Sequence, residues 1–74
     1  MPRLPQVSGR EAVAVFRRAG WVLSRTHGSH HILRNPDTGQ HLSVPGHDTL
    51  KPGLLTDLIK RAGLTVEEFI GLLK

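Results

Sequence analysis

Residues 21–44 read WVLSRTHGSHHILRNPDTGQHLSV, and this stretch holds three short apolar runs separated by turn residues. His27-Gly28 is typical of a tight turn between two strands. Residues 35–39, NPDTG, favour a turn at nearly every position, and Pro45-Gly46 ends the third run. The stretch therefore predicts a meander of three antiparallel strands, at residues 21–25, 30–34 and 41–44.

Successive side chains of a strand point to opposite faces of the sheet, so the second strand divides its residues into two sets. His30 and Arg34 fall on one face, and His31 and Leu33 fall on the other. We expect Leu33 to join the core with the apolar residues of the third strand. His30 then lies on the open face with Arg34, next to a turn where Gly28 removes side-chain bulk.

Two capping boxes, each a Ser or Thr followed by Glu three residues later, mark helix starts on either side of this meander. Apolar residues recur at helical spacing after each box and again after Pro52. The predicted helices are one at about 9–19 behind Ser8 and Glu11, one from Leu50–Gly53 to Gly63, and a short one behind Thr65 and Glu68. The order α-β-β-β-α-α predicts an α+β fold in which helices cover one face of the sheet and leave the other wet.

The length of 74 residues predicts one domain over 1–74, with an extended or flexible segment at residues 1–7. The chain is 38% hydrophobic, with one Trp, two Phe and no Tyr, so we expect one thin core and a shallow site. It has no Cys, which removes disulfides, thiolate nucleophiles and thiolate metal ligands. No run of about 18 apolar residues occurs, so we expect a soluble, cytoplasmic protein that does not engage a membrane.

Positive charge is concentrated in the first half of the chain. The formal net charge is +4, and residues 1–36 contain six arginines against one acid, Glu11. Arginine presents a planar fork that suits bidentate contact with phosphate. This half therefore favours a polyanion partner, the alternative being a basic, solvated surface without one.

Three of the five histidines, His27, His30 and His31, lie close together in this half. They suggest zinc, but Gly28 breaks the helix that a helical zinc motif needs, and His30 and His31 point to opposite faces of a strand. We therefore expect no metal ion and no other cofactor. The cluster is either a set of ordinary surface histidines or a site for proton transfer, because imidazole exchanges protons near neutral pH.

Several short motifs follow one another along nearly the whole chain. They are Gly20-Trp21, Gly28-Ser29-His30, Asn35-Pro36, Val44-Pro45 with His47, Gly53, and KRAGL at residues 60–64. In this order they resemble the HicA family, the small mRNA interferase toxins of bacterial and archaeal toxin–antitoxin pairs.

The resemblance implies a fold like a double-stranded-RNA-binding domain (dsRBD) and ribonuclease action on messenger RNA that inhibits translation. It implies that the histidine of the Gly-Ser-His motif is essential. That histidine is His30 here, with His31 as the second choice and with Gly28 and Ser29 setting the local geometry. It also implies mRNA and a HicB-type antitoxin as partners. We expect the cations of the basic half and the lysine before the second helix to hold the RNA backbone: Arg17, Arg18, Arg25, Arg34 and Lys51.

Cleavage of RNA needs no metal in principle, because the 2′-OH is a built-in nucleophile and the enzyme has only to move protons and stabilise charge. Two other classes of function remain open. One is a non-catalytic RNA-binding module of the same fold, which grips RNA by its shape. The other is a protein-interaction domain whose open sheet face docks a partner. An acidic partner suits that face, because it carries His30, Ile32 and Arg34.

Overall fold

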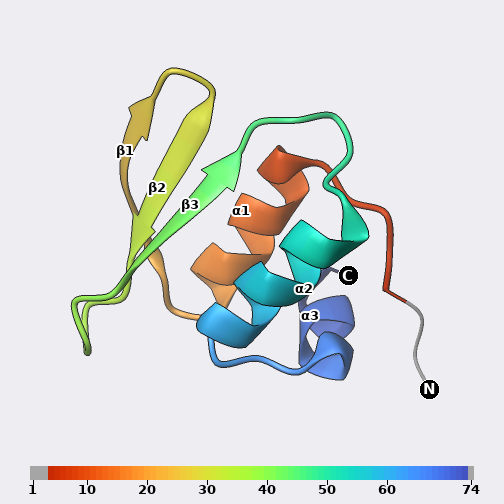
Figure 1. Cartoon of the computed structure of the whole chain (residues 1–74). Helices are drawn as coiled ribbons and strands as arrows, with labels where there is room; N and C mark the ends of the chain where they lie inside the picture. Colours follow the sequence, from red (N-terminus) through yellow and green to blue (C-terminus); the bar gives the residue numbers. More distant parts are fainter. Residues whose placement is uncertain (1–3, 74) are drawn as a thin grey trace.

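The computed structural model of the chain describes residues 4–73, which form a three-stranded sheet and three helices. The elements are α1 (Gly9–Arg18), β1 (Val22–His27), β2 (His30–Arg34), β3 (His41–Pro45), α2 (Pro52–Arg61) and α3 (Val66–Leu73). All three strands are antiparallel, in the order β1-β2-β3. The helices gather on one side of the sheet and leave its other face uncovered (Figure 1). The predicted α+β, dsRBD-like fold is confirmed.

Both predicted capping boxes form. At the start of α1, Ser8 Oγ accepts from the Glu11 N–H at 3.1 Å and Glu11 Oε1 accepts from the Ser8 N–H at 3.0 Å. At the start of α3, Thr65 and Glu68 exchange the same two bonds at 3.1 and 2.9 Å. Each box satisfies backbone donors that a helix start leaves unpaired, so these pairs fix where the two helices begin.

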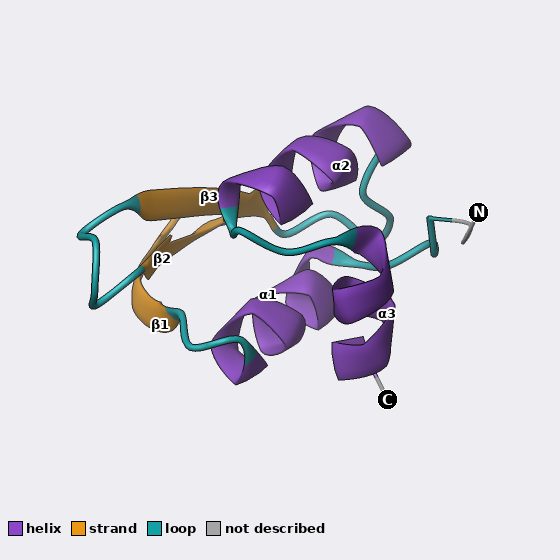
Figure 2. Cartoon of the chain, turned by 90° about the horizontal axis from the view of Figure 1, so that it is seen from below, coloured by secondary structure: helices purple, strands orange, loops and turns teal. Residues whose placement is uncertain are grey.

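The core lies between the inner face of the sheet, which faces the helices, and α1. The two phenylalanines meet there, Phe16 of α1 and Phe69 of α3, with ring centroids 5.7 Å apart. Figure 2 shows α2 on the β3 side of the sheet and α1 on the β1 side, with α3 packed beside α1 away from the strands. Burying these apolar faces together is the main source of stability for so small a domain.

The predicted division of β2 between two faces is confirmed. Leu33 is fully buried, and its neighbours on β3, Leu42 and Val44, are 2% and 0% exposed. Because side chains alternate along a strand, His31 shares the inner face with Leu33, and His30 lies on the open face, away from the helices. A single-residue slip would have exchanged these two histidines.

The first strand runs two residues further than its apolar run predicts. Thr26 pairs with His31 and His27 pairs with His30, so the ladder continues to a loop of only Gly28 and Ser29. Gly28 has φ +61°, the left-handed region that a side chain disfavours. Polar residues extend this strand because their backbones find partners on β2. The pairing register of β1 with β2 shifts between Leu23 and Arg25, which marks a β-bulge.

Part of the predicted N-terminal segment packs against the domain. Val7 is 3% exposed, and its carbonyl accepts from the Leu50 N–H at 2.8 Å. Residues 1–3 of that segment lie outside the described residues. None of the helices within residues 4–73 is long and apolar enough to cross a membrane.

Gly9 and Gly53 offer a matched test of how closely α1 is packed against β3. A Cβ on Gly9 would lie 2.0 Å from the Pro45 carbonyl oxygen, whereas a Cβ on Gly53 of α2 would meet nothing within 4 Å. Gly9→Ala should lower the free energy of unfolding by about 1–3 kcal/mol through overpacking. Gly53→Ala should raise it by about 0.5–1 kcal/mol, because Ala is the better helix former. Urea unfolding measures both, and equal effects would contradict the close approach.

Candidate functional site

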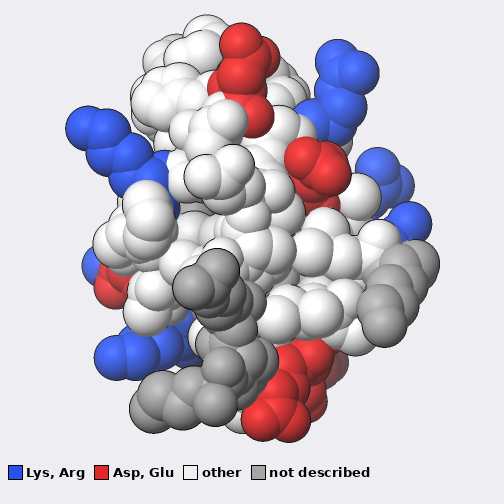
Figure 3. All heavy atoms as spheres, turned by 90° about the vertical axis from the view of Figure 1, so that its right-hand side faces the viewer, with Lys and Arg blue, Asp and Glu red and all other residues white. Residues whose placement is uncertain are grey.

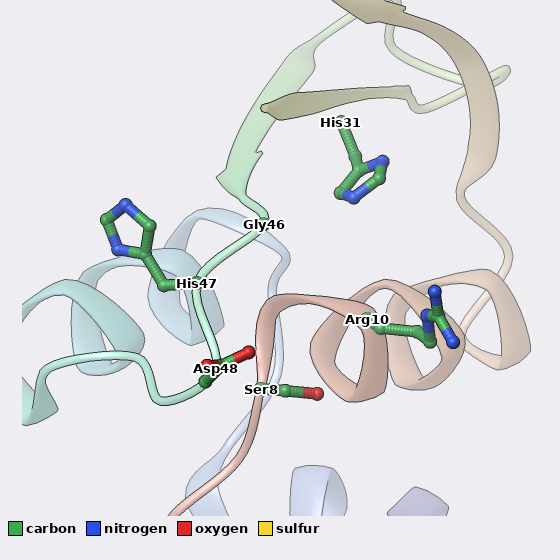
Figure 4. Close-up of a pocket in the computed structure, with 6 residues that line it drawn as sticks. All are labelled: Ser8, Arg10, His31, Gly46, His47 and Asp48. Atoms are coloured by element: carbon green, nitrogen blue, oxygen red, sulfur yellow. The ribbon is translucent and has the colours of Figure 1, made fainter. Parts of the chain in front are cut away.

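A hollow of about 390 Å³ opens where the start of α1, the start of β2 and the loop after β3 meet. We call it the junction hollow (Figure 4). Its lining residues are Ser8, Arg10, His31, Gly46, His47 and Asp48.

Two glycines bring these three segments together. The Gly9 N–H donates to the His47 carbonyl at 2.9 Å, and the absence of a side chain on Gly9 lets α1 start against the Pro45 carbonyl. The Gly46 N–H donates to the carbonyl of Ser29 at the hairpin tip, 2.5 Å away. A Cβ on Gly46 would lie 2.9 Å from that same oxygen, closer than real Cβ atoms come. The hollow therefore depends on backbone contacts that only glycine permits.

His31 is the histidine that faces the junction hollow. It is half-buried on the inner face, and its Nδ1 lies 3.4 Å from Thr26 Oγ1, on the paired strand β1. Its Nε2 lies 3.4 Å from where a Cβ of Gly46 would stand. Figure 4 shows the ring pointing from β2 toward the start of α1. Thr26 thus touches one ring nitrogen and leaves the other, Nε2, toward the hollow.

Charged groups of both signs line the hollow with this imidazole. Arg10 of α1 is exposed and forms no ion pair with a residue in the described range 4–73. Asp48 approaches from the loop after β3, beside Ser8, and the His47 ring points away from His31 (Figure 4). Across residues 4–73, no three His, Asp or Glu side chains come together as metal ligands would. The arrangement offers a proton-exchanging group and a free guanidinium on one surface.

His30, the first choice from the sequence, lies elsewhere. It is exposed on the open face, where it pairs with His27 and Pro45, and it does not line the junction hollow. Arg34 shares that face but lies four residues further along β2. At the rise per residue of a strand, it is about 13 Å from His30. Arg25, opposite Ile32, is also on the open face and exposed. The ladder pairs His30 with His27, and Arg25 is its diagonal neighbour on the same face.

The remaining predicted cations lie on or beside the helices, away from the open face. Arg18 donates through Nη1 to the Leu72 carbonyl at 2.5 Å, so it binds the end of α3. Arg17 is exposed on α1, and Lys51 is exposed just before α2, where its side chain makes no capping bond. Figure 3 views the side of the molecule away from the sheet and shows acidic and basic side chains interspersed there. Among the described cations, Arg25 and Arg34 are the two that the register places on the open face of the sheet.

Sequence reasoning did not single out Arg10 or Asp48 as site residues. Arg10 follows the capping Ser8 in the chain, and its position two residues into a capped helix carries no functional signal of its own. Asp48 lies in a loop of ordinary turn residues. The place of these two residues in the site depends on tertiary contacts, because the contacts of Gly9 and Gly46 bring their segments to the hollow that His31 lines.

An open three-stranded sheet with a basic face, backed by helices and bordered by a histidine-containing hollow, defines a small α+β protein of the dsRBD-like class. Residues 9–64 of the 74 match the family model of the HicA toxin of bacterial toxin–antitoxin systems. The chain belongs to this family, which makes it the toxin of a pair that includes an antitoxin. No curated protein matches the chain closely enough to count as a relative.

Proposed function

We propose that this toxin is a metal-independent endoribonuclease that cleaves messenger RNA and thereby inhibits translation. The observation that carries the proposal is the His31 imidazole, whose Nε2 faces a surface hollow that it shares with the unpaired guanidinium of Arg10. Proton transfer and phosphate stabilisation are the two tasks that RNA cleavage requires. The hollow is open enough for a flexible single strand to reach.

The reaction uses the nucleophile of the substrate. His31 removes the proton from a 2′-OH, the 2′ oxygen attacks the adjacent phosphorus, and the bond from phosphorus to the 5′ oxygen breaks. The leaving 5′ oxygen takes up a proton, from the imidazolium or from water. The products are a 2′,3′-cyclic phosphate and a 5′-OH, so protons and bonds balance without a further reactant. DNA lacks the 2′-OH and would stay intact.

Arg10 and Thr26 have supporting roles in this scheme. The Arg10 guanidinium stabilises the negative charge that builds on the phosphorus oxygens, since it forms no ion pair within residues 4–73, Asp48 of the same hollow included. The Thr26 hydroxyl, 3.4 Å from Nδ1, positions the ring so that Nε2 meets the substrate. Proton transfer by one histidine contributes about 10²–10⁴-fold to the rate, which suits a toxin that depletes messages slowly.

The sequence order favours His30 as the essential histidine, and the geometry favours His31. His30 has imidazole and proline as its cross-strand neighbours and Arg25 as a diagonal neighbour, and it does not line the junction hollow. His31 lines that hollow with the Arg10 guanidinium and has the Thr26 hydroxyl beside it. We therefore assign the proton transfer to His31 and leave His30 on the RNA-facing open side.

Adjacent histidines on opposite faces provide the test of this assignment. His31→Ala should reduce cleavage of mixed RNA in EDTA by about 10²–10⁴-fold, the usual share of a general acid or base. His30→Ala, its matched control, should cleave at close to the wild-type rate. New 2′,3′-cyclic phosphate ends measure the reaction. Loss of activity only in His30→Ala would return the role to His30, and RNA binding without any cleavage would leave a non-catalytic RNA-binding module.

The open-face arginines are proposed to hold the RNA backbone. Arg25→Ala and Arg34→Ala should each weaken RNA binding and lower the slope of log affinity against log salt by about 0.7–1, because each removes one phosphate contact. Lys60→Ala, an exposed cation of α2, is the control and should change neither. Equal effects from all three variants would mean that net charge rather than this face drives association.

The antitoxin is proposed to be of the HicB type and to cover the open face. Val22 there is 54% exposed, beside Arg25 and Arg34, so an acidic partner gains both apolar contact and charge complementarity. Such a partner competes with RNA for the same arginines. Amide exchange in the complex should show protection of β1 and β2 at the hairpin. Protection confined to α3 around Phe69 would contradict competition and require an allosteric mechanism.

A further inference from the structure

A second hollow, of about 260 Å³, lies at the opposite end of the sheet from the junction hollow. We call it the Trp21 hollow, and its lining residues are Trp21, Gln40, His41 and Arg61. It forms where the segment before β1, the start of β3 and the end of α2 meet, at the lower end of the molecule in Figure 1. A water needs roughly 10–15 Å³ of such space, so the hollow admits a group of several heavy atoms.

Trp21 lines this hollow, and its indole has a hydrogen-bond donor. Trp21 is 4% exposed, and no residue within 4–73 accepts from its Nε1–H. Among the described residues, no side-chain nitrogen is both fully inaccessible and without a hydrogen-bond partner. The Nε1–H therefore reaches solvent, and the hollow is the surface that Trp21 lines. Because it reaches solvent, this N–H can donate to a group that enters the hollow.

The other lining groups are also donors. Arg61 uses Nε for Asp57 Oδ2 at 3.0 Å, and within residues 4–73 its terminal nitrogens have no acceptor. Guanidinium and indole can only donate, and Gln40 and His41 can each donate as well. Asp57 forms an ion pair with Arg61, and neither Asp57 nor Asp37 of the β2–β3 turn lines the hollow. A hollow lined by these donors favours an anion that has several hydrogen-bond acceptors.

We propose that the Trp21 hollow binds a phosphodiester of the RNA strand at a distance from the cleaved bond. This rests on the proposed ribonuclease function and extends it to a second contact that sets substrate length. β3 begins at His41, beside this hollow, and leads to Gly46 in the junction hollow, a span of about 17 Å. At the roughly 3.4 Å rise of a stacked strand that span is about five nucleotides.

Guanidinium groups lie along the sheet between its two ends, on the open face rather than on the inner face toward which His31 points. Arg25 lies opposite Ile32 near the hairpin, and Arg34 lies opposite His41, next to the Trp21 hollow. A strand that runs along this face meets Arg25 and Arg34, and it has to cross the edge of the sheet to reach His31. The two hollows then fix its register, because each admits a phosphate at a set place.

The single tryptophan gives a direct readout, since the chain has no Tyr and no other Trp. The probe is a single-stranded 2′-O-methyl RNA of about ten nucleotides, within the usual range of single-strand sites, which cannot be cleaved. Titration of the full chain should change Trp21 emission with saturation. A strand of about two nucleotides and inorganic phosphate should both need at least about tenfold higher concentration, because neither can engage both hollows.

Three variants separate the hollow from the ion pair. Arg61→Ala should raise the Kd of the longer strand about three- to tenfold, as expected for loss of one charge-assisted contact. Lys60→Ala, its exposed neighbour, should bind as wild type. Asp57→Asn breaks the same ion pair but keeps the guanidinium, and it should bind at least as well as wild type. On cleavable RNA, Arg61→Ala should raise KM for long substrates and leave short ones unchanged.

The outcomes distinguish this site from the catalytic proposal. If RNA is bound and cleaved while Trp21 emission stays constant, or if Arg61→Ala and Lys60→Ala bind equally well, the phosphodiester site is wrong and the ribonuclease stands. If the strand shifts Trp21 but RNA is never cleaved, the site stands and the ribonuclease fails. If inorganic phosphate saturates the signal as tightly as the longer strand, the hollow is a free-anion site and the proposal is overturned.

Discussion

The close approach of backbone to backbone at Gly9 and Gly46 is the constraint on which the site depends. Gly9 lets the start of α1 lie against the Pro45 carbonyl, and Gly46 binds the Ser29 carbonyl at the hairpin tip. These contacts join three segments that are far apart in the chain. A Cβ at either position would separate them, since the interior of so small a protein has no spare space to absorb it. The helix start, the hairpin and the loop after β3 therefore form one unit.

That unit gives the two adjacent histidines different surroundings. Strand alternation sends His30 to the open, basic face and His31 to the inner face, at the edge where the core ends. Leu33 determines which is which, because it is fully buried and shares the inner face with His31. In the proposed account, one face of the hairpin contacts the RNA backbone and the other carries out proton transfer. The turn at Gly28 and Ser29 has only two residues. In this account, one RNA strand can therefore reach both faces of the hairpin.

Local patterns predicted most of the fold, because its element boundaries rest on local chemistry. The capping pairs at Ser8 and Thr65 and the turn at residues 35–39 are set by residues close in sequence, and they form as predicted. The length of β1 was not predictable, since the polar residues near Thr26 join the sheet only through pairing with β2. The same holds for Arg10 in the site, which tertiary contacts bring to His31. Arg18, a predicted RNA contact, also donates to the Leu72 carbonyl, a long-range bond that local patterns do not predict.

The central claim is that the junction hollow around His31, and not the open face around His30, holds the phosphate that reacts. A crystal structure of the protein with a single-stranded RNA blocked by 2′-O-methyl groups tests it most directly. The account predicts a phosphate within hydrogen-bond distance of His31 Nε2, about 2.6–3.2 Å, with the Arg10 guanidinium on its oxygens. A strand whose only phosphate contact to a histidine is at His30, with the junction hollow filled by water, would contradict it.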